Sequence, residues 1–142
     1  MTTTSTGTAS TATLTDTDVA RAVFQAFADA DLAALGDLLH ADATWHHRNE
    51  DRLGGVYHGS DAIMAFLAQS AQLTAGTLRA VPQSFMADGA GRVCVLVRLS
   101  ATRPDGRAMD GPQLVLVTLD GGRVRSIDQF VGDPAAVAAF WA

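Results

Sequence analysis

The sequence predicts one α+β domain, with helices packed on one face of a curved antiparallel sheet. In the first half, apolar residues recur at helical spacing, whereas the second half alternates turn signals with extended apolar segments. Helices followed by a run of strands are typical of the α+β class. A chain of 142 residues with 48% hydrophobic composition is long enough to bury a core without disulfides.

Three helices are expected in the first half of the chain and one at its end. Asp16 or Thr17 can cap the first helix, and leucines from residue 32 to residue 39 predict a short second one. Ser60 is the predicted N-cap of the third helix. Gly132-Asp133-Pro134 precedes the terminal helix, because proline suits a first helical turn.

One strand is expected between the second and third helices, and four more are expected after the third. The predicted strands cover residues 43–47, 78–86, 92–102, 113–119 and 123–131, with a brief extended piece at 56–58. The segments Asp88 to Gly91, Pro104 to Gly106 and Asp120 to Gly122 are turn signals between the last four. This order predicts an antiparallel meander.

The strand at residues 92–102 is apolar on both of its alternating sets. Val93, Val95 and Val97 lie on one set, and Cys94 and Leu96 lie on the other. A two-layer antiparallel sheet normally has a polar open face. We therefore expect one face to line a pocket and the other to pack against a second subunit, as a homodimer.

Composition excludes several function classes. A net charge of −5 argues against nucleic acid, whose phosphates need clustered cations. All ten basic residues are arginines, which excludes lysine Schiff bases and a Walker-type phosphate loop. Cys94 is the single cysteine and fits a small core residue better than a nucleophile. The longest apolar run is too short to span a bilayer, and we expect no cofactor, metal or membrane partner.

Residues 1–14 are mostly Thr, Ser and Ala, which predicts a disordered leader before a domain at residues 15–142. The segment lacks the basic and apolar regions of a signal peptide. With no export signal and no disulfide, we expect a cytoplasmic protein.

Four segments in this order resemble a known family. They are Ala41-Asp42-Ala43-Thr44-Trp45-His46, the stretch from Gly55 to Ile63, Asp120-Gly121-Gly122-Arg123-Val124 and Ser126-Ile127-Asp128-Gln129-Phe130. Over about residues 16–141 the chain resembles the SnoaL-like group of the nuclear-transport-factor-two-like superfamily. The resemblance implies a cone: a strongly curved antiparallel sheet wrapped around three helices, enclosing one apolar cavity, in a dimer. Relatives include polyketide cyclases, ketosteroid isomerases, limonene-epoxide hydrolases and non-catalytic domains, so fold alone does not give the function.

His47 is the predicted catalytic base. Alternation puts Trp45 and His47 on one face of their strand and His46 on the other, so the two histidines cannot easily share a metal ion. The resemblance turns Trp45 and His47 inward, because the isomerase base lies where His47 does. In the epoxide hydrolases a water-orienting asparagine takes that place, and a tyrosine matches Trp45. Imidazole exchanges protons at neutral pH. The alternative is a structural histidine at a strand end.

Arg98 is the predicted electrostatic partner of His47. It shares a face with Leu96, and the epoxide hydrolases place a catalytic aspartate at the position that matches Arg98. A cationic side chain in an apolar cavity needs a partner such as Asp110 or a substrate oxygen. The alternative is a solvated Arg98 at the cavity rim.

Gln129 matches the second catalytic aspartate of the epoxide hydrolases and could orient a carbonyl or a water. Ile127 and Val131 share its face, and Gln113 begins the facing strand. Asp128 points the opposite way unless a bulge intervenes. Tyr57 could cover the pocket mouth or donate a hydrogen bond, or it could simply pack in its loop.

The departures from the family pattern shape the predicted function. The aspartate–arginine–aspartate set of the epoxide hydrolases is replaced by Leu96, Arg98 and Gln129, and the isomerase tyrosine falls at about Val23. We therefore expect a cofactor-independent isomerase or cyclase with His47 as base, acting on a small apolar carbonyl or polyketide-like molecule. The first alternative is a non-catalytic small-molecule-binding or assembly domain. The second alternative is an enzyme that activates water as the epoxide hydrolases do. The remaining alternative is a stable scaffold whose cavity is vestigial and closed.

Overall fold

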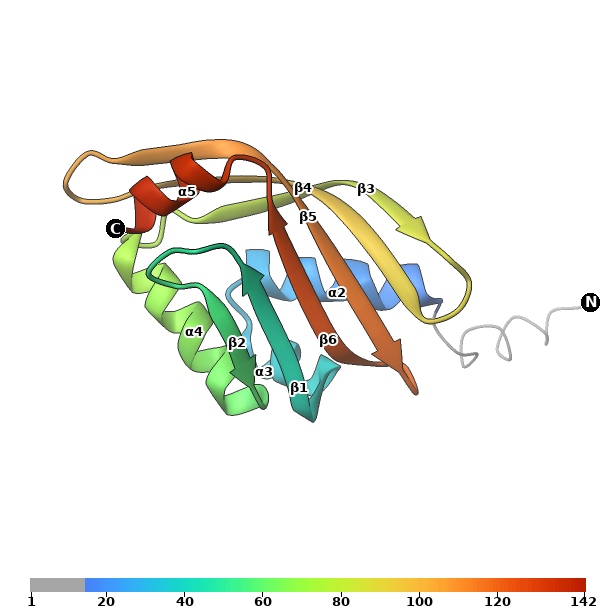
Figure 1. Ribbon diagram of the computed structural model, residues 1–142. Helices are drawn as coiled ribbons and strands as arrows, with labels where there is room; N and C mark the ends of the chain where they lie inside the picture. The colour runs from blue at the N-terminus through green and yellow to red at the C-terminus, as the bar shows by residue number, and fades with distance from the viewer. Residues whose placement is uncertain (1–14) are drawn as a thin grey trace, which may run out of the picture.

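The computed structural model describes residues 15–142, and the leader predicted at residues 1–14 lies outside the described part (Figure 1). The helices are α2 (Asp16–Ala28), α3 (Leu32–Leu38), α4 (Ser60–Leu73) and α5 (Pro134–Trp141). The strands are β1 (Leu39–Arg48), β2 (Gly55–His58), β3 (Arg79–Ala87), β4 (Arg92–Thr102), β5 (Ala108–Asp120) and β6 (Arg123–Val131). The predicted α+β class is confirmed.

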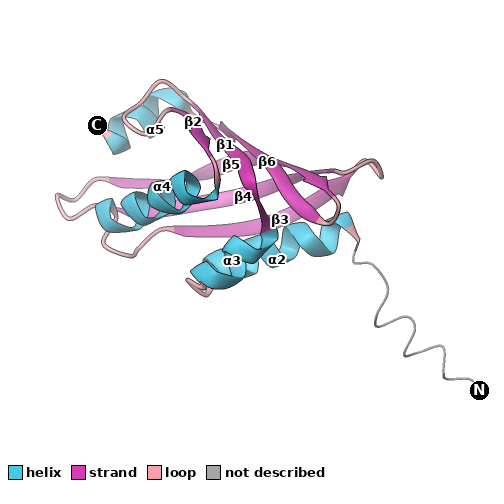
Figure 2. Ribbon diagram, turned by 90° about the horizontal axis from the view of Figure 1, so that it is seen from below, coloured by secondary structure: helices cyan, strands magenta, loops and turns pink. Residues whose placement is uncertain are grey.

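The six strands form one curved, open sheet in the order β2-β1-β6-β5-β4-β3. Figure 2 shows α2, α3 and α4 on the same side of this sheet, as expected for a cone. One pairing differs from the predicted antiparallel arrangement, because β1 and β6 run parallel. Most of the chain separates these two strands, so no tight turn forces them to be antiparallel.

The helix starts differ in detail from the predicted caps. Thr15 caps α2, and its side chain and that of Asp18 form a reciprocal capping box. Gly59 rather than Ser60 is the N-cap of α4. Its φ of +90° lies in the region that favours glycine, which explains why the cap falls one residue earlier.

The core lies between the helices and the concave face of the sheet. On β4 the buried set is Val93, Val95, Val97 and Leu99. Leu114 and Phe130 are 41% and 42% exposed and lie on the opposite, convex face, because they alternate with buried Gln113 and Gln129. Apolar side chains therefore occupy both faces of the sheet. None of the helices within residues 15–142 is both long and apolar enough to cross a membrane.

Candidate functional site

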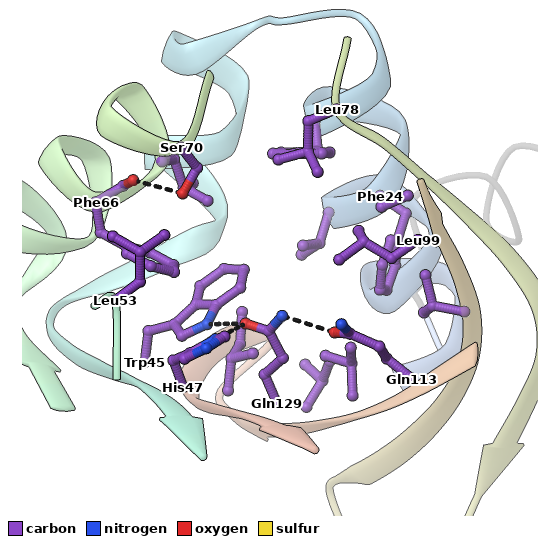
Figure 3. Close-up of a pocket in the computed structure, with 18 of the residues that line it drawn as sticks. Phe24, Trp45, His47, Leu53, Phe66, Ser70, Leu78, Leu99, Gln113 and Gln129 are labelled. Atoms are coloured by element: carbon purple, nitrogen blue, oxygen red, sulfur yellow. Dashed lines mark hydrogen bonds between the residues drawn. The ribbon is translucent and has the colours of Figure 1, made fainter. Parts of the chain in front are cut away.

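A cavity of about 70 Å³ lies between the concave face of the sheet and the helices (Figure 3). Its walls are almost entirely apolar and include Phe24 and Phe27 of α2, Phe66 and Leu67 of α4, and Trp141 of α5. The polar groups among the lining residues are Trp45, His47, Ser70, Gln113 and Gln129. Such a combination, apolar walls with a few converging polar groups, is typical of small-molecule sites.

Four of these polar side chains form one hydrogen-bonded row across three adjacent strands (Figure 3). The parallel register places His47 of β1 opposite Gln129 of β6. Trp45 Nε1 donates to Gln129 Oε1 at 3.1 Å, and His47 Nδ1 lies 3.2 Å from the same oxygen. Gln129 Nε2 donates in turn to Gln113 Oε1 of β5 at 2.7 Å. The row therefore forms the polar end of the cavity.

Asp51 contacts Nε2, the ring nitrogen of His47 that does not face Gln129. His47 Nε2 lies 2.9 Å from Asp51 Oδ2, and both side chains are almost completely buried, at 2% and 0% exposed. The same carboxylate accepts from Asn49 Nδ2 at 2.7 Å and from the Leu53 backbone N–H at 2.8 Å. Three donors compensate the cost of burying this carboxylate.

Sequence reasoning missed Asp51. It lies in a loop of charged residues and glycine, which reads as solvated, and loops have no periodicity that indicates which side chains turn inward. Its spacing of four residues from His47 and the apolar Leu53 two residues later were the available signals. Leu53 is 1% exposed and anchors the loop in the core.

The donors and acceptors of this network determine where its protons lie. The indole N–H of Trp45 can only donate, so Gln129 must turn Oε1 toward it. Because that oxygen also faces His47 Nδ1, the contact is a hydrogen bond only when Nδ1 carries a proton. A further proton lies between His47 Nε2 and Asp51. When His47 keeps only the proton shared with Asp51, the lone pair of Nδ1 faces Gln129 Oε1, and this contact is not a hydrogen bond.

The structure brings together five of the predicted site residues. Trp45, His47, Gln113, Ile127 and Gln129 all line the cavity. Asp128 lies on the convex face, where its carboxylate pairs with Arg48 at 2.7 Å. The sheet therefore turns Gln129 inward and Asp128 outward, as strand alternation indicated.

The predicted place of Arg98 in the cavity is wrong. Arg98 lies on the convex face, 55% exposed, and pairs with an equally exposed Asp110 at 2.9 Å. Neither residue lines the cavity, and Leu96, on the same face as Arg98, does not line it either. The alternating set of β4 that contains Arg98 also contains Arg92, Ser100 and Thr102, whereas the other set is entirely apolar and is the buried one. The open alternative, a solvated Arg98, is the correct one.

Tyr57 and Val131 lie beside the cavity rather than in its wall. The Tyr57 hydroxyl donates to the Leu53 carbonyl at 2.7 Å, and its ring stacks on Phe66 with centroids 4.3 Å apart. Burial, and secondarily the negative charge of Asp51, raise the pKa of Tyr57 above its usual value of 10.0. Tyr57 thus supports the wall that Phe66 and Leu53 form.

Within residues 15–142, no three His, Cys, Asp or Glu side chains come together in a way that could hold a metal ion. His46 lies on the convex face near Asp128, as the alternation predicted, and is separated from His47 by the sheet. The residues that surround the cavity therefore offer hydrogen bonds and one proton-exchanging group.

Comparison with known proteins places this geometry in a family. Uncharacterized proteins of Mycobacterium tuberculosis and Mycobacterium bovis are 35% identical over 127 residues, covering 89% of this chain and 96% of theirs. The structure of Bal32a, from a soil-derived mobile gene cassette, is similar with a TM-score of 0.86 and 28% identity, over 89% of this chain and 96% of that one.

A putative SnoaL-like polyketide cyclase from Jannaschia shares the fold, with a TM-score of 0.74 and 19% identity, over 89% of this chain and 92% of that one. The family model for the SnoaL-like domain matches residues 20–127. The predicted resemblance is confirmed, and this chain belongs to the SnoaL-like family.

Proposed function

We propose that this protein is a cofactor-independent acid–base catalyst, of the isomerase or cyclase type, for a small and mostly apolar carbonyl compound. The observation that carries the proposal is the buried His47–Asp51 pair at the polar end of an otherwise apolar cavity. A buried carboxylate that holds one ring nitrogen of a histidine fixes the ring and leaves the other nitrogen for the substrate. Here that nitrogen is Nδ1, which a substrate reaches by displacing Gln129 Oε1.

In the proposed reaction, His47 Nδ1 removes a proton from a carbon next to the carbonyl and leaves an enolate. Isomerisation follows when His47 returns this proton to a different carbon. Ring closure follows when the enolate carbon attacks a second carbonyl and His47 gives the proton to the resulting alkoxide. In either case the proton count balances without a cofactor, and His47 ends in its starting state.

Gln113 takes the oxyanion-stabilising role that the sequence suggested for Arg98. Its Oε1 accepts from Gln129, and its amide nitrogen forms no hydrogen bond within residues 15–142. Gln113 lines the cavity and is only 4% exposed, so this amide N–H is available to a ligand oxygen. A donor aimed at a developing enolate oxygen is worth more in a dry site than in water.

Deuterium exchange tests the proposal without knowledge of the natural substrate. We expect the wild type in D₂O to accelerate exchange of the methyl protons of acetone, which is smaller than benzene, followed by proton NMR. His47→Gln should reduce the rate to the buffer background, whereas the exposed control His58→Gln should retain it, with circular dichroism showing both folded. Wild-type exchange in His47→Gln would refute His47 as the base.

One observation favours the second candidate, a non-catalytic small-molecule-binding domain. Both ring nitrogens of His47 contact protein groups, so a ligand must displace Gln129 before Nδ1 can act. This candidate predicts binding of ketones with no exchange above background in the wild type. Epoxide-hydrolase-like water activation has less support, because no carboxylate lines the cavity.

We also propose that the convex face of the sheet forms a homodimer interface. Leu114 and Phe130 lie opposite one another there, beside the ion pair of Arg48 with Asp128. An isologous interface uses the same patch twice, and a patch carrying both charges next to apolar groups can complement its own copy. This proposal retains the prediction made from the doubly apolar strand.

A further inference from the structure

A second hollow, the outer groove, lies between the first residues of β5 and the start of α5. It is lined by residues 108–113 of β5, by Leu99 of β4, and by residues of the segment 132–137 that include Asp133, Ala136 and Val137. Its open space is about 360 Å³, about five times that of the inner cavity that contains His47. The proposed function above does not use this groove.

The groove exists because β6 is shorter than β5. The last pair between them joins Gln113 to Val131, so residues 108–112 of β5 have no strand beside them on that edge. Gly132 then turns the chain away into α5, and a Cβ at that position would lie 2.5 Å from the Pro112 carbonyl oxygen. This close approach requires glycine and sets α5 across the free edge of β5.

Two residues line both hollows, Leu99 and Gln113. They therefore lie at the junction between the inner cavity and the outer groove. Among residues 15–142 the Gln113 side chain is bonded through its Oε1, which accepts from Gln129, and no hydrogen bond is formed by its amide nitrogen. A ligand oxygen at the junction would accept a hydrogen bond from this amide nitrogen.

Size decides how a ligand can occupy this site. An apolar protein cavity that takes up benzene has a volume of about 150 Å³. At about 70 Å³ the inner cavity is less than half as large, so it admits only a group smaller than a benzene ring. A molecule with several carbonyls along a chain needs further space, and the groove adjoins the cavity at Leu99 and Gln113, which line both.

Charge restricts the class of ligand. None of the residues that line the two hollows is an arginine. The groove instead contains the carboxylates of Asp133, which caps Ala136 N at 3.1 Å, and Asp110, which pairs with Arg98. An anionic tail would find no counter-charge, so an uncharged tail is expected.

We infer that the ligand is an elongated, neutral ketone. Its small apolar head enters the inner cavity, its carbonyl accepts from Gln113 Nε2 at the junction, and its chain lies in the outer groove against Ala136 and Val137. The carbonyl class rests on the proposed function. The use of the groove rests on the geometry alone.

Binding of a homologous series of 2-alkanones, from 2-butanone to 2-decanone, tests the inference by NMR titration of the full chain. We expect affinity to rise about threefold to fourfold for each added methylene that is buried, beyond the length that the inner cavity can hold. Nuclear Overhauser effects should connect the terminal methyl of 2-decanone to Met109 and Val137, both of which line the groove.

Ala136→Leu should fill the groove without harm to the helix, because leucine favours helices and Ala136 is exposed. We expect it to weaken 2-decanone binding at least tenfold and to change 2-butanone binding less than twofold. Ala135→Leu, on the same helix but outside the groove, should bind both ketones like the wild type.

Three results would overturn the inference: affinity that stops rising at the shortest ketones, no contact of the chain end with Met109 or Val137, or equal binding of 2-decanone by Ala136→Leu and Ala135→Leu. Failure to bind any ketone would overturn it together with the carbonyl class. Loss of catalysis is a separate result, since the exchange assay depends on His47 and this titration measures binding only.

Discussion

Removal of the Asp51 carboxylate is the sharpest test of how this site is held together. Asp51→Ala deletes the acceptor of three hydrogen bonds, from His47, Asn49 and the Leu53 backbone. Each hydrogen bond to a charged group is worth about 1.5–3 kcal/mol, but contributions from one group do not add fully. The three donors then stay buried without an acceptor, and together they cost about 3–5 kcal/mol. We expect Asp51→Ala to lower the free energy of unfolding by that amount.

Urea denaturation followed by tryptophan fluorescence measures this change, since Trp45 lies in the same network as His47. Asp110→Ala is the matched control, because it also removes an aspartate that pairs with a basic side chain. Both members of that pair are 55% exposed, and surface pairs contribute about 0–1 kcal/mol. The reasoning would be refuted if Asp51→Ala cost less than about 1 kcal/mol or no more than Asp110→Ala.

Two further predictions follow from the wall of the cavity and from the sheet surface. Tyr57 is the single tyrosine, so absorbance at alkaline pH follows the titration of this residue alone. The titration midpoint should exceed 10.0, and Asp51→Asn should lower the midpoint by removing a negative charge. Because the pKa of Tyr57 is higher in the folded state, its contribution to the free energy of unfolding is present below pH 10 and is lost as the pH rises through the folded pKa. A titration midpoint at or below 10.0 would contradict the burial of Tyr57. On the convex face, Leu114→Arg should convert a dimer into monomers in sedimentation experiments, whereas Leu32→Arg, at an exposed position on α3, should not; a wild type that sediments as a monomer at all concentrations would refute the proposed interface.

Two features of the site, the burial of Asp51 and the outward orientation of Arg98, were not predicted from the sequence. Arg98 matched a catalytic position of a related family, and an arginine among valines suggested a buried charge with a function. The other alternating set of its strand is entirely apolar, however, whereas the set of Arg98 also contains Arg92, Ser100 and Thr102, so alternation favoured a solvated Arg98 over the family match. The helices cover only the face of Val93, Val95 and Val97, so Arg98 lies on the uncovered face of the sheet.

The α+β class, the strands at residues 92–102 and 123–131, and the separation of His46 from His47 could all be predicted from the sequence. These features depend on local periodicity and turn residues, which a chain carries wherever it folds. The family resemblance added the inward direction of Trp45 and His47.

The groups that contact His47 are brought to it by the packing of the whole fold. Gln129 reaches it through a parallel strand pair that joins residues 82 positions apart, and Asp51 reaches it through a loop anchored by Leu53. Spacing along the chain does not by itself determine either contact, because strand order and loop burial depend on how the whole core packs. The proposed base is therefore indicated by the sequence, while the carboxylate behind it and the amide donor Gln113 beside it are consequences of the fold.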